Sequence, residues 1–425
     1  MIRFLYTLIL SLLAPFLLLG LYRKKAGKPT FGPRWKEHFG QTPGLNTQER
    51  PLWIHAVSVG ESIAATPIIK ALKSQFPELP ILVTTTTSTG AQQIAKLGDL
   101  VEHRYMPLDF PFAIHRFLQI IKPRALLIME TELWPNTLHA VSSSGIPIAL
   151  LNARLSAGSY RNYQKIRPLF DLMADKLDLI LCQDASDAER FKQLGLDEDQ
   201  VKVTGSVKFD ISVPANTKAQ AEQLRQFLGE KRPVWIAAST HPGEDEQIFS
   251  AHKQLLQRIP DALLIIVPRH PERFIPVTAL AAESQLPCVT RSSQQPVTPD
   301  IKVYIGDTMG EMLTLIGAAD ICFMAGSLIG DKVGGHNVLE PAALGKATIT
   351  GPSYFNFQQI VDALYAHNAC KVVDQSRLSE ELHYLFTHPA KRYELGKNGS
   401  DYVANNRGAI KATIDHIVEK RLTNA

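Results

Sequence analysis

The stretch WIHAVSVGES, residues 53–62, contains the strand-to-helix unit on which the fold is built. Trp53–Val57 is an apolar run typical of a buried strand, and Gly60 allows a tight turn into a helix expected over Ala64–Gln75. Glu61 therefore stands at the carboxyl end of a strand, where a helix opens. Its carboxylate either stabilises the helix dipole or faces a cleft as a general base, and this stretch alone favours neither role.

Short β-rich runs separated by helix-like stretches recur from residue 52 onward, which indicates βα units and a parallel sheet. Expected helices include Thr89–Leu97 and Pro111–Ile121. The first series of further expected strands is Ile81–Thr87, Val101–Met106, Ala125–Met129, Pro147–Leu151, Leu177–Gln183 and Val201–Gly205. A linker rich in Ala, Gln and Lys, Pro214–Lys231, precedes a second series, which comprises Val234–Ala238, Ala262–Val267, Lys302–Ile305, Ile321–Met324 and Ala347–Thr350.

Two such series predict an α/β protein with two Rossmann-like domains that face each other across a cleft, with ligand bound at the carboxyl ends of the strands. We expect a membrane anchor and its basic flank over residues 1–36, a first domain over 37–213 and a second domain over 214–425. The last helix, roughly Lys411–Arg421, is a candidate to pack back on the first domain.

The N-terminus has the composition of a membrane anchor. Phe4–Tyr22 is an uncharged run of 19 residues, which at about 1.5 Å per residue just reaches the ~30 Å of a hydrocarbon core. Arg23, Lys24 and Lys25 follow at once, so the positive-inside rule predicts that the body stays in the cytoplasm. A helix lying flat in one leaflet is the alternative, whereas a cleaved signal peptide fits poorly because no small-x-small site precedes the basic cluster.

The positive charge of the chain is concentrated near this anchor. Residues 1–36 contain seven basic residues and no acid, so removing them from the 45 basic residues of the chain leaves 38 against 41 acidic ones. A body without basic excess argues against nucleic acid as a partner. Basic and aromatic residues alternate within FGPRWKEHFG, residues 31–40, which includes Arg34 and Trp35. This pattern indicates either anchoring at the membrane interface or contact with an anionic lipid substrate.

Further polar side chains follow expected strands of the first domain. Glu130 and Glu132 come directly after Ala125–Met129, and we expect one of them to cap a helix and the other, preferably Glu130, to be functional. Lys208 in TGSVKFD lies where the two domains should meet. It is either a surface lysine at a hinge or a cation for a phosphate or carboxylate.

The second domain offers candidate anion and nucleotide sites. Arg269, after Pro268 at a strand end, suits a phosphate, and GDTMGE, residues 306–311, opens a helix that suits a phosphate or a base edge. In GGHNVLEP, residues 334–341, Glu340 lies three residues after Asn337 and is placed either for ribose hydroxyls or for a capping box.

Other chemistries lack support in the sequence. No GxGxxG follows the first strand and no Walker A sequence occurs, which disfavours NAD and P-loop chemistry, and no Ser-His-Asp signature is present. Asp197-Glu-Asp199 lies in a polar connection and is interpreted as a solvated turn, so no metal site is predicted.

Taken together, these motifs give the chain a family resemblance. It resembles the 3-deoxy-D-manno-oct-2-ulosonic acid (Kdo) transferases of Gram-negative bacteria, which are membrane-anchored glycosyltransferases of the two-domain B-type fold. The likeness covers nearly the whole chain. The matching segments are HAVSVGES (55–62), METELWPN (129–136), NARLS (152–156), TGSVKFDIS (204–212), STHPGE (239–244), VPRHPERF (267–274), GDTMGE (306–311) and GGHNVLEP (334–341).

The resemblance implies a reaction and roles for these residues. The donor would be CMP-Kdo and the acceptor the phosphorylated, acylated glucosamine disaccharide precursor of lipid A (lipid IVA), at the bacterial inner membrane. Glu61 would be the general base of an inverting, metal-independent transfer without a cofactor, and Glu130 and Lys208 would stabilise the transition state. The first domain would bind the acceptor and the second CMP, through the residues Pro268, Arg269, Met309, Gly310, Glu311, Asn337, Val338, Leu339 and Glu340.

The acceptor contacts are less closely matched. Arg34, Trp35, Arg154 and Arg161 are the candidates, but the family often has Arg where this chain has Gly158. Two other functions compete with the transferase: another nucleotide-sugar glycosyltransferase or epimerase of the same fold, and a membrane-tethered scaffold without turnover. The presence of Glu61, Glu130, Lys208 and Arg269 counts against the scaffold, because a scaffold without turnover has no need of a base beside a phosphate site.

Overall fold

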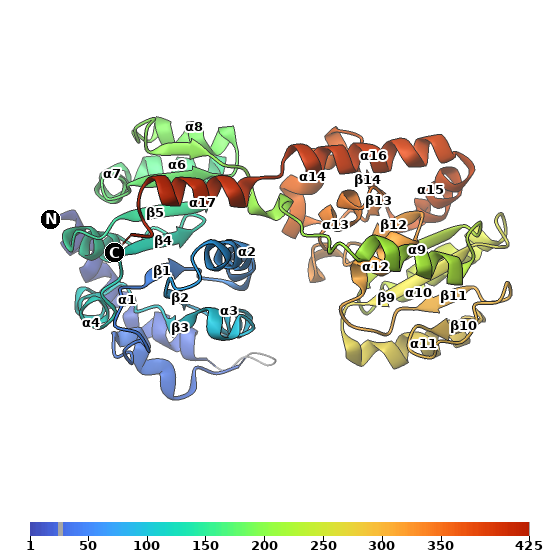
Figure 1. Cartoon of the computed structure of the whole chain (residues 1–425), viewed down its shortest axis with the longest axis horizontal. Helices are drawn as coiled ribbons and strands as arrows, with labels where there is room; N and C mark the ends of the chain where they lie inside the picture. Colours follow the sequence, from blue (N-terminus) through green and yellow to red (C-terminus); the bar gives the residue numbers. More distant parts are fainter. Residues whose placement is uncertain (24–28, 425) are drawn as a thin grey trace. The chain divides into compact units, whose positions relative to one another are not determined.

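The computed structural model describes residues 1–23 and 29–424, and its chain divides into two compact units (Figure 1). Unit 1 consists of Met1–Asp210 and Arg407–Ala425, and unit 2 of Ile211–Asn406. Three residues of the predicted basic flank, Lys24, Lys25 and Lys28, lie outside the described residues.

Unit 1 is built on a parallel sheet of seven strands in the order β3-β2-β1-β4-β5-β6-β7. The strands are β1 (Leu52–His55), β2 (Ile81–Thr85), β3 (Glu102–Tyr105), β4 (Ala125–Met129), β5 (Ile148–Ala153), β6 (Leu179–Cys182) and β7 (Val201–Val203). The helices between them are α2 (Val59–Gln75), α3 (Ser88–Ala95), α4 (Pro111–Ile121), α5 (Pro135–Ser143), α6 (Ala157–Lys165), α7 (Arg167–Ala174) and α8 (Ala185–Gln193).

Helices cover both faces of this sheet because successive residues of its strands point to opposite sides. Trp53 of β1 belongs to an apolar cluster with side chains of α4, α5, α7 and α8, whereas its neighbours Leu52 and Ile54 belong to a second cluster with side chains of α2 and α3. The strands β1, β2, β4, β5 and β6 are buried at every position, as expected for a sheet enclosed in this way.

Unit 2 repeats the architecture with seven parallel strands in the order β10-β11-β9-β8-β12-β13-β14. They are β8 (Val234–Thr240), β9 (Leu263–Pro268), β10 (Cys288–Thr290), β11 (Val303–Ile305), β12 (Ile321–Met324), β13 (Ala347–Thr350) and β14 (Lys371–Val372). The main helices are α9 (Thr217–Leu228), α10 (Asp245–Leu256), α11 (Phe274–Glu283), α12 (Met312–Ala318), α13 (Leu339–Ala343), α14 (Gln358–Ala366), α15 (Gln375–Thr387) and α16 (Pro389–Asn405). Two parallel sheets with covering helices confirm the predicted α/β fold class.

One predicted connection is a helix. We expected a linker over Pro214–Lys231, but Thr217–Leu228 forms α9, which packs against α12. Its buried residues Ala221, Leu224 and Leu228 recur at helical spacing and give the segment an apolar stripe despite its polar composition.

The C-terminal helix α17 (Ala409–Glu419) belongs to unit 1, where it contacts α2. Ala409, Ile414 and Ile417 are buried in the same apolar cluster as the inner side of α2. Asp210 fixes the start of this helix, because its carboxylate accepts hydrogen bonds from the backbone N–H groups of Gly408 and Ile410, each at 2.6 Å. The end of the chain is thereby attached to the unit in which the chain begins.

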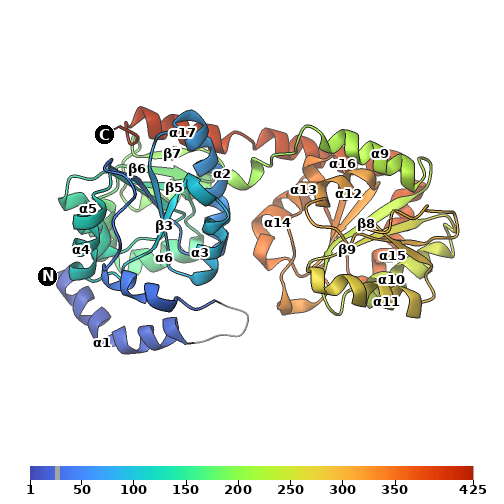
Figure 2. The same cartoon turned by 60° about the horizontal axis from the view of Figure 1, so that its bottom comes forward.

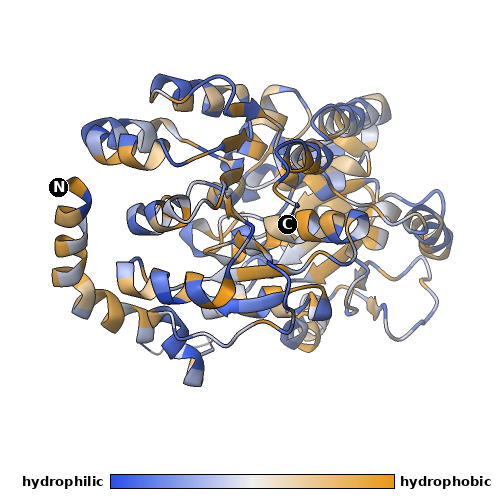
Figure 3. Cartoon of the chain, turned by 60° about the vertical axis from the view of Figure 1, so that its left-hand side comes forward, coloured by the Kyte–Doolittle hydropathy of each residue, from blue (hydrophilic) through white to orange (hydrophobic). Residues whose placement is uncertain are grey.

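At the other end of the chain, α1 (Ile2–Tyr22) is long and apolar enough to cross a membrane by length and composition. The side chains that unit 1 partly covers recur at helical spacing along its whole length: Arg3, Tyr6, Thr7, Leu10, Ala14, Leu18, Leu21 and Tyr22. Near one end, Asn136 Nδ2 donates to Thr7 Oγ1 at 2.9 Å, and at the other Tyr22 Oη lies 2.8 Å from His38 Nδ1. The helix therefore lies lengthwise along unit 1 and exposes its opposite, apolar side (Figures 2 and 3).

We expect the substitution Asp210→Ala to loosen α17 locally. Removing a carboxylate that caps a helix costs about 1 kcal/mol, so the backbone amides of α17 should exchange hydrogen roughly fivefold faster. Hydrogen-exchange mass spectrometry of peptides spanning 407–420 measures this. The matched control is Asp415→Ala, which removes an exposed pair with Lys411 worth only a few tenths of a kcal/mol. Equal exchange in the two variants would contradict the capping role.

Candidate active site

Glu61 is a buried carboxylate at the start of α2, directly after β1. Val57 N–H donates to its Oε2 and the Ser58 hydroxyl to its Oε1, both at 2.8 Å, and Ser58 caps the helix by accepting from Glu61 N–H. The pKa of Glu61 is raised to about 7, mainly by burial and to a smaller extent by the charges of Glu132 and Glu130. The two hydrogen bonds lower this pKa but do not offset the burial. A carboxylate with a pKa near neutrality can accept a proton from a substrate hydroxyl.

Glu130 and Glu132 lie close enough to Glu61 to affect its pKa, so the structure brings the three acids together. Glu130 has a left-handed backbone (φ 57°) immediately after β4, which turns the chain sharply at the carboxyl edge of the sheet. Both side chains are partly exposed, and Glu132 accepts a hydrogen bond from the indole of Trp134 at 3.3 Å.

The expectation that one of these acids caps a helix is wrong. The first backbone N–H groups of α5 belong to Asn136 and Thr137, and both donate to the carboxylate of Asp109, at 3.1 and 2.7 Å. Asp109 is buried and comes from the loop before α4, so the cap is supplied by a residue distant in sequence.

Lys208 is exposed in a short 3-10 helix, Val207–Phe209, that contacts α2. Asn152, at the end of β5, holds this segment because its Oδ1 accepts from Val207 N–H at 3.2 Å. The Nδ2 of Asn152 and the hydroxyl of Ser206 are buried without a hydrogen-bond partner. Lys208 is thus a cation on the same side of the sheet as Glu61, beside polar groups with unused bonding capacity.

In unit 2, Arg269 is exposed directly after β9, and its backbone N–H donates to Thr240 O at 3.0 Å. Its charge lowers the pKa of Glu340 and of His336, which places the predicted phosphate and ribose ligands in one neighbourhood. Burial outweighs this effect at Glu340 and raises its pKa, while Asn337 Nδ2 donates to Glu340 at 3.4 Å.

Three histidines surround Arg269. His241 Nε2 and His336 Nε2 lie 2.8 Å apart with their rings stacked, and His270 meets His241 edge to face. Burial, together with His241, Arg269 and His270, lowers the pKa of His336 to about 4. The lowered pKa values of His241 and His336 favour their neutral forms, so the positive charge beside these two rings comes from arginine.

The remaining predicted CMP-binding residues differ in what they can offer. Met309 is exposed and Gly310 has a left-handed backbone (φ 83°), whereas the side chains of Val338 and Leu339 are fully buried and can present only backbone. Glu311 pairs with Arg291 at 2.9 Å, and this hydrogen bond is the main cause of its lowered pKa. Pro268 ends β9 with its side chain buried.

Glu244 organises the loops of this site. It is fully buried before α10, and its carboxylate accepts four backbone hydrogen bonds, from His241 at 3.1 Å, Gly326 and Ser327 at 2.8 Å and Leu328 at 2.9 Å. One side chain thereby joins the turn after β8 to the loop after β12. Neighbouring Asp245 is ion-paired with Arg273 and accepts from Thr240 Oγ1 at 2.6 Å. Arg273 also donates to Thr240 O at 2.7 Å, so it joins the start of α10 to the end of β8.

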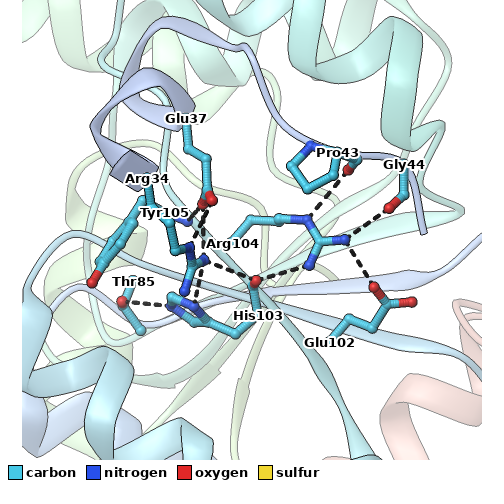
Figure 4. Close-up of polar contacts among 9 residues, drawn as sticks. All are labelled: Arg34, Glu37, Pro43, Gly44, Thr85, Glu102, His103, Arg104 and Tyr105. Atoms are coloured by element: carbon cyan, nitrogen blue, oxygen red, sulfur yellow. Dashed lines mark hydrogen bonds and ion pairs between the residues drawn. The ribbon is translucent and has the colours of Figure 1, made fainter. Parts of the chain in front are cut away.

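Of the predicted acceptor residues, Arg34 is engaged inside the fold (Figure 4). It forms a bidentate pair with buried Glu37 at 2.7 and 2.9 Å, donates to His103 O at 3.1 Å and lies over the Tyr105 ring. These contacts tie the segment Gly32–Phe39 to β3. Trp35, Arg154 and Arg161 are exposed.

Comparisons with known proteins show the family of the chain. A sequence model described as 3-deoxy-D-manno-octulosonic-acid transferase (kdotransferase) matches residues 33–211. The 3-deoxy-D-manno-octulosonic acid transferase of Haemophilus influenzae is 38% identical over 417 residues, 97% of each chain. The chain belongs to the Kdo transferase family. It is therefore a glycosyltransferase that acts in lipopolysaccharide synthesis.

Two further likenesses extend the comparison. The Kdo transferase of Bordetella pertussis is 35% identical over 433 residues, which cover 97% of this chain and 98% of that one. A glycosyltransferase structure from Rickettsia africae has a TM-score of 0.54 at 14% identity, covering 89% of this chain and all of that chain. Such a distant likeness shows the fold alone, and that fold is the B-type glycosyltransferase fold.

Several residues of the candidate site were not predicted from the sequence. Glu244 lay within the quoted STHPGE, but its four partners are up to 84 positions away and a single sequence does not reveal such pairs. For the histidine cluster the sequence offered a weaker signal: His241 and His270 come just after β8 and β9, whereas His336 lies in the loop between β12 and α13. Among the described residues, no group of three or more His, Cys, Asp or Glu could hold a metal ion.

We expect Glu244→Gln to destabilise unit 2. An amide offers one acceptor oxygen and turns donors toward backbone N–H groups, so the free energy of unfolding should fall by about 2–4 kcal/mol. Denaturant unfolding followed by tryptophan fluorescence measures this, with Glu246→Gln, an exposed neighbour, as control. A Glu244→Gln midpoint equal to the control's would show that the four hydrogen bonds add no net stability.

Proposed function

We propose that this Kdo transferase moves Kdo from CMP-Kdo to the phosphorylated, acylated glucosamine disaccharide of the lipid A precursor (lipid IVA), with inversion at the anomeric carbon. The observation that carries the proposal is Glu61: a buried carboxylate with a pKa of about 7 at the carboxyl end of β1, inside the segment that matches the family. A group with this pKa is ionised in about half of the molecules near pH 7 and is a competent general base there.

In the proposed mechanism Glu61 takes the proton of the acceptor hydroxyl as its oxygen attacks the anomeric carbon. Attack from the face opposite the leaving group inverts that carbon. CMP leaves as a phosphate monoester and requires little acid assistance. Glu130 and Lys208 stabilise the charges that develop during transfer, and Lys208 is also a suitable partner for the carboxylate of the sugar.

The donor binds unit 2 in this proposal. Arg269 pairs with the phosphate, and the lowered pKa values of His241 and His336 favour their neutral forms beside it. Glu340 accepts from the ribose hydroxyls, and the chain at Met309–Glu311 and Asn337–Glu340 contributes contacts to the nucleotide. No step in this scheme requires a metal or a cofactor.

We further propose that α1 attaches the enzyme to the bacterial inner membrane, with the body on the cytoplasmic side. Support comes from the apolar exposed side of α1 and from the excess of basic residues in the first 36 positions.

We expect Glu61→Gln to reduce the rate of transfer by about 10²–10⁴-fold while leaving CMP binding unchanged, because the amide cannot accept a proton. Transfer to the tetra-acylated precursor is measured in detergent by mass spectrometry, with CMP-Kdo generated in situ. Glu78→Gln, an exposed acid beyond the end of α2, is the control. Full turnover by Glu61→Gln would remove Glu61 from the mechanism. Turnover of a UDP-sugar in place of CMP-Kdo would favour another glycosyltransferase or an epimerase.

The pH dependence of transfer provides a separate test. Glu61 must be deprotonated to act, so kcat/KM should rise with pH to a plateau above about pH 7. The Ser58 hydroxyl lowers the pKa of Glu61, so Ser58→Ala should move this rise to higher pH. A profile unchanged in Ser58→Ala would indicate that another group controls the rise.

A further inference from the structure

A cavity of about 750 Å³ lies between the C-terminal half of α1 and the segment that follows it. This volume is typical of small-molecule sites. Its walls are mainly apolar and aromatic, with Leu18, Leu21 and Tyr22 from α1 and Phe31, Trp35 and Phe39 from the following segment. The position of the cavity, between the membrane-anchoring helix and the catalytic unit, suggests a ligand that the membrane supplies.

The walls of this cavity are held in place by the fold. Tyr22 Oη lies 2.8 Å from His38 Nδ1, and the Tyr22 ring meets that of Phe31 edge to face. Phe31 in turn packs edge to face on Tyr105 at the end of β3. The Arg34–Glu37 pair fixes the same segment to β3 (Figure 4). The cavity is therefore a formed feature of unit 1.

One side of the cavity is polar and adjoins Glu61. Thr87, Ser88 and Thr89, at the start of α3, complete the lining. The Thr87 hydroxyl donates to Val57 O at 3.4 Å, and the N–H of the same Val57 donates to the Glu61 carboxylate at 2.8 Å. One residue thus separates the lining of the cavity from the proposed general base.

We propose that this cavity binds an acyl chain of the lipid acceptor, so that its sugar head group extends past Thr87–Thr89 to Glu61. The inference rests on the proposed function and adds the place where the acceptor's lipid part is held. An acyl chain suits apolar and aromatic walls, and the polar side suits the junction of chain and sugar. Arg23 also lines the cavity and matches the negative charge of a phosphorylated glycolipid.

Gly20 provides a way to fill the cavity. It lines the cavity, and a Cβ added there would meet no atom within 4 Å, so a side chain can begin there without a clash. Gly20→Trp should raise the KM for the tetra-acylated acceptor at least tenfold, because displacing about two buried methylenes of the acyl chain from the cavity costs that much affinity. The affinity for CMP should stay unchanged. Leu19→Trp adds the same ring beside it, where the side chain is 70% exposed and outside the lining, and should behave as wild type.

Photocrosslinking shows directly which residues the acyl chain contacts. The full-length protein in phospholipid nanodiscs is irradiated with a tetra-acylated, phosphorylated glucosamine disaccharide that carries a diazirine in one acyl chain. We expect adducts within residues 18–22 and 31–39 of the wild type. The yield of these adducts should be at least fivefold lower in Gly20→Trp and the same as in the wild type in Leu19→Trp. Adducts restricted to the outer side of α1, at Leu12 and Phe16, would show contact with bulk lipid only and overturn the proposal.

The two proposals fail in different ways. If the wild type transfers Kdo but Gly20→Trp retains both its KM and its labelling, the cavity proposal is wrong and the proposed function stands. If the wild type labels in the cavity but transfers no Kdo, the cavity binds an acyl chain and the proposed function is wrong.

Discussion

The enclosure of both sheets by helices constrains everything else in this protein. Strands buried on both faces admit almost no charged side chain along their length, so polar chemistry is confined to the strand ends. Glu61, Glu130 and Arg269 each follow the carboxyl end of a strand within a few residues. Since neighbouring parallel strands end at the same edge, β1 and β4 bring two acids together although 69 positions separate them. The clustering of these acids at one edge thus follows from burial.

Backbone strain is concentrated at the same edges. Glu130, Asn152 and Ser239 adopt left-handed conformations (φ 57°, 54° and 63°) at the ends of β4, β5 and β8. Such a conformation costs a non-glycine residue about 1–3 kcal/mol and persists only where neighbours enforce it. Here Glu130 N–H donates to Leu151 O at 2.8 Å, and Gln183 Nε2 donates to Asn152 O at 2.9 Å. The left-handed residues redirect the chain at the edges where the candidate functional side chains follow the strands.

The predictability of each feature from sequence depended on whether its cause is local. The strands β4, β12 and β13 were predicted to the residue, because a buried strand carries its own apolar run. The two-residue edge strand β14 was not predicted because so short a run carries no pattern, and the three-residue edge strand β10 was also missed. The Asp109 cap on α5 and the bonds of Glu244 depend on partners brought together by the fold, and one sequence holds no record of such pairs.

Glu61 and Glu244 show how the same local sequence can serve two purposes. Each follows a glycine where the chain passes from a strand to a helix. Gly60 and Glu61 lie in the first turn of α2, and Gly243 and Glu244 lie just before α10. A carboxylate has about four acceptor positions, and Glu244 uses four on backbone N–H groups. Among the described residues, Glu61 receives two hydrogen bonds and lies near two further acids that favour its protonation. The fully bonded carboxylate holds loops together, whereas the partly bonded one retains the capacity to take up a proton.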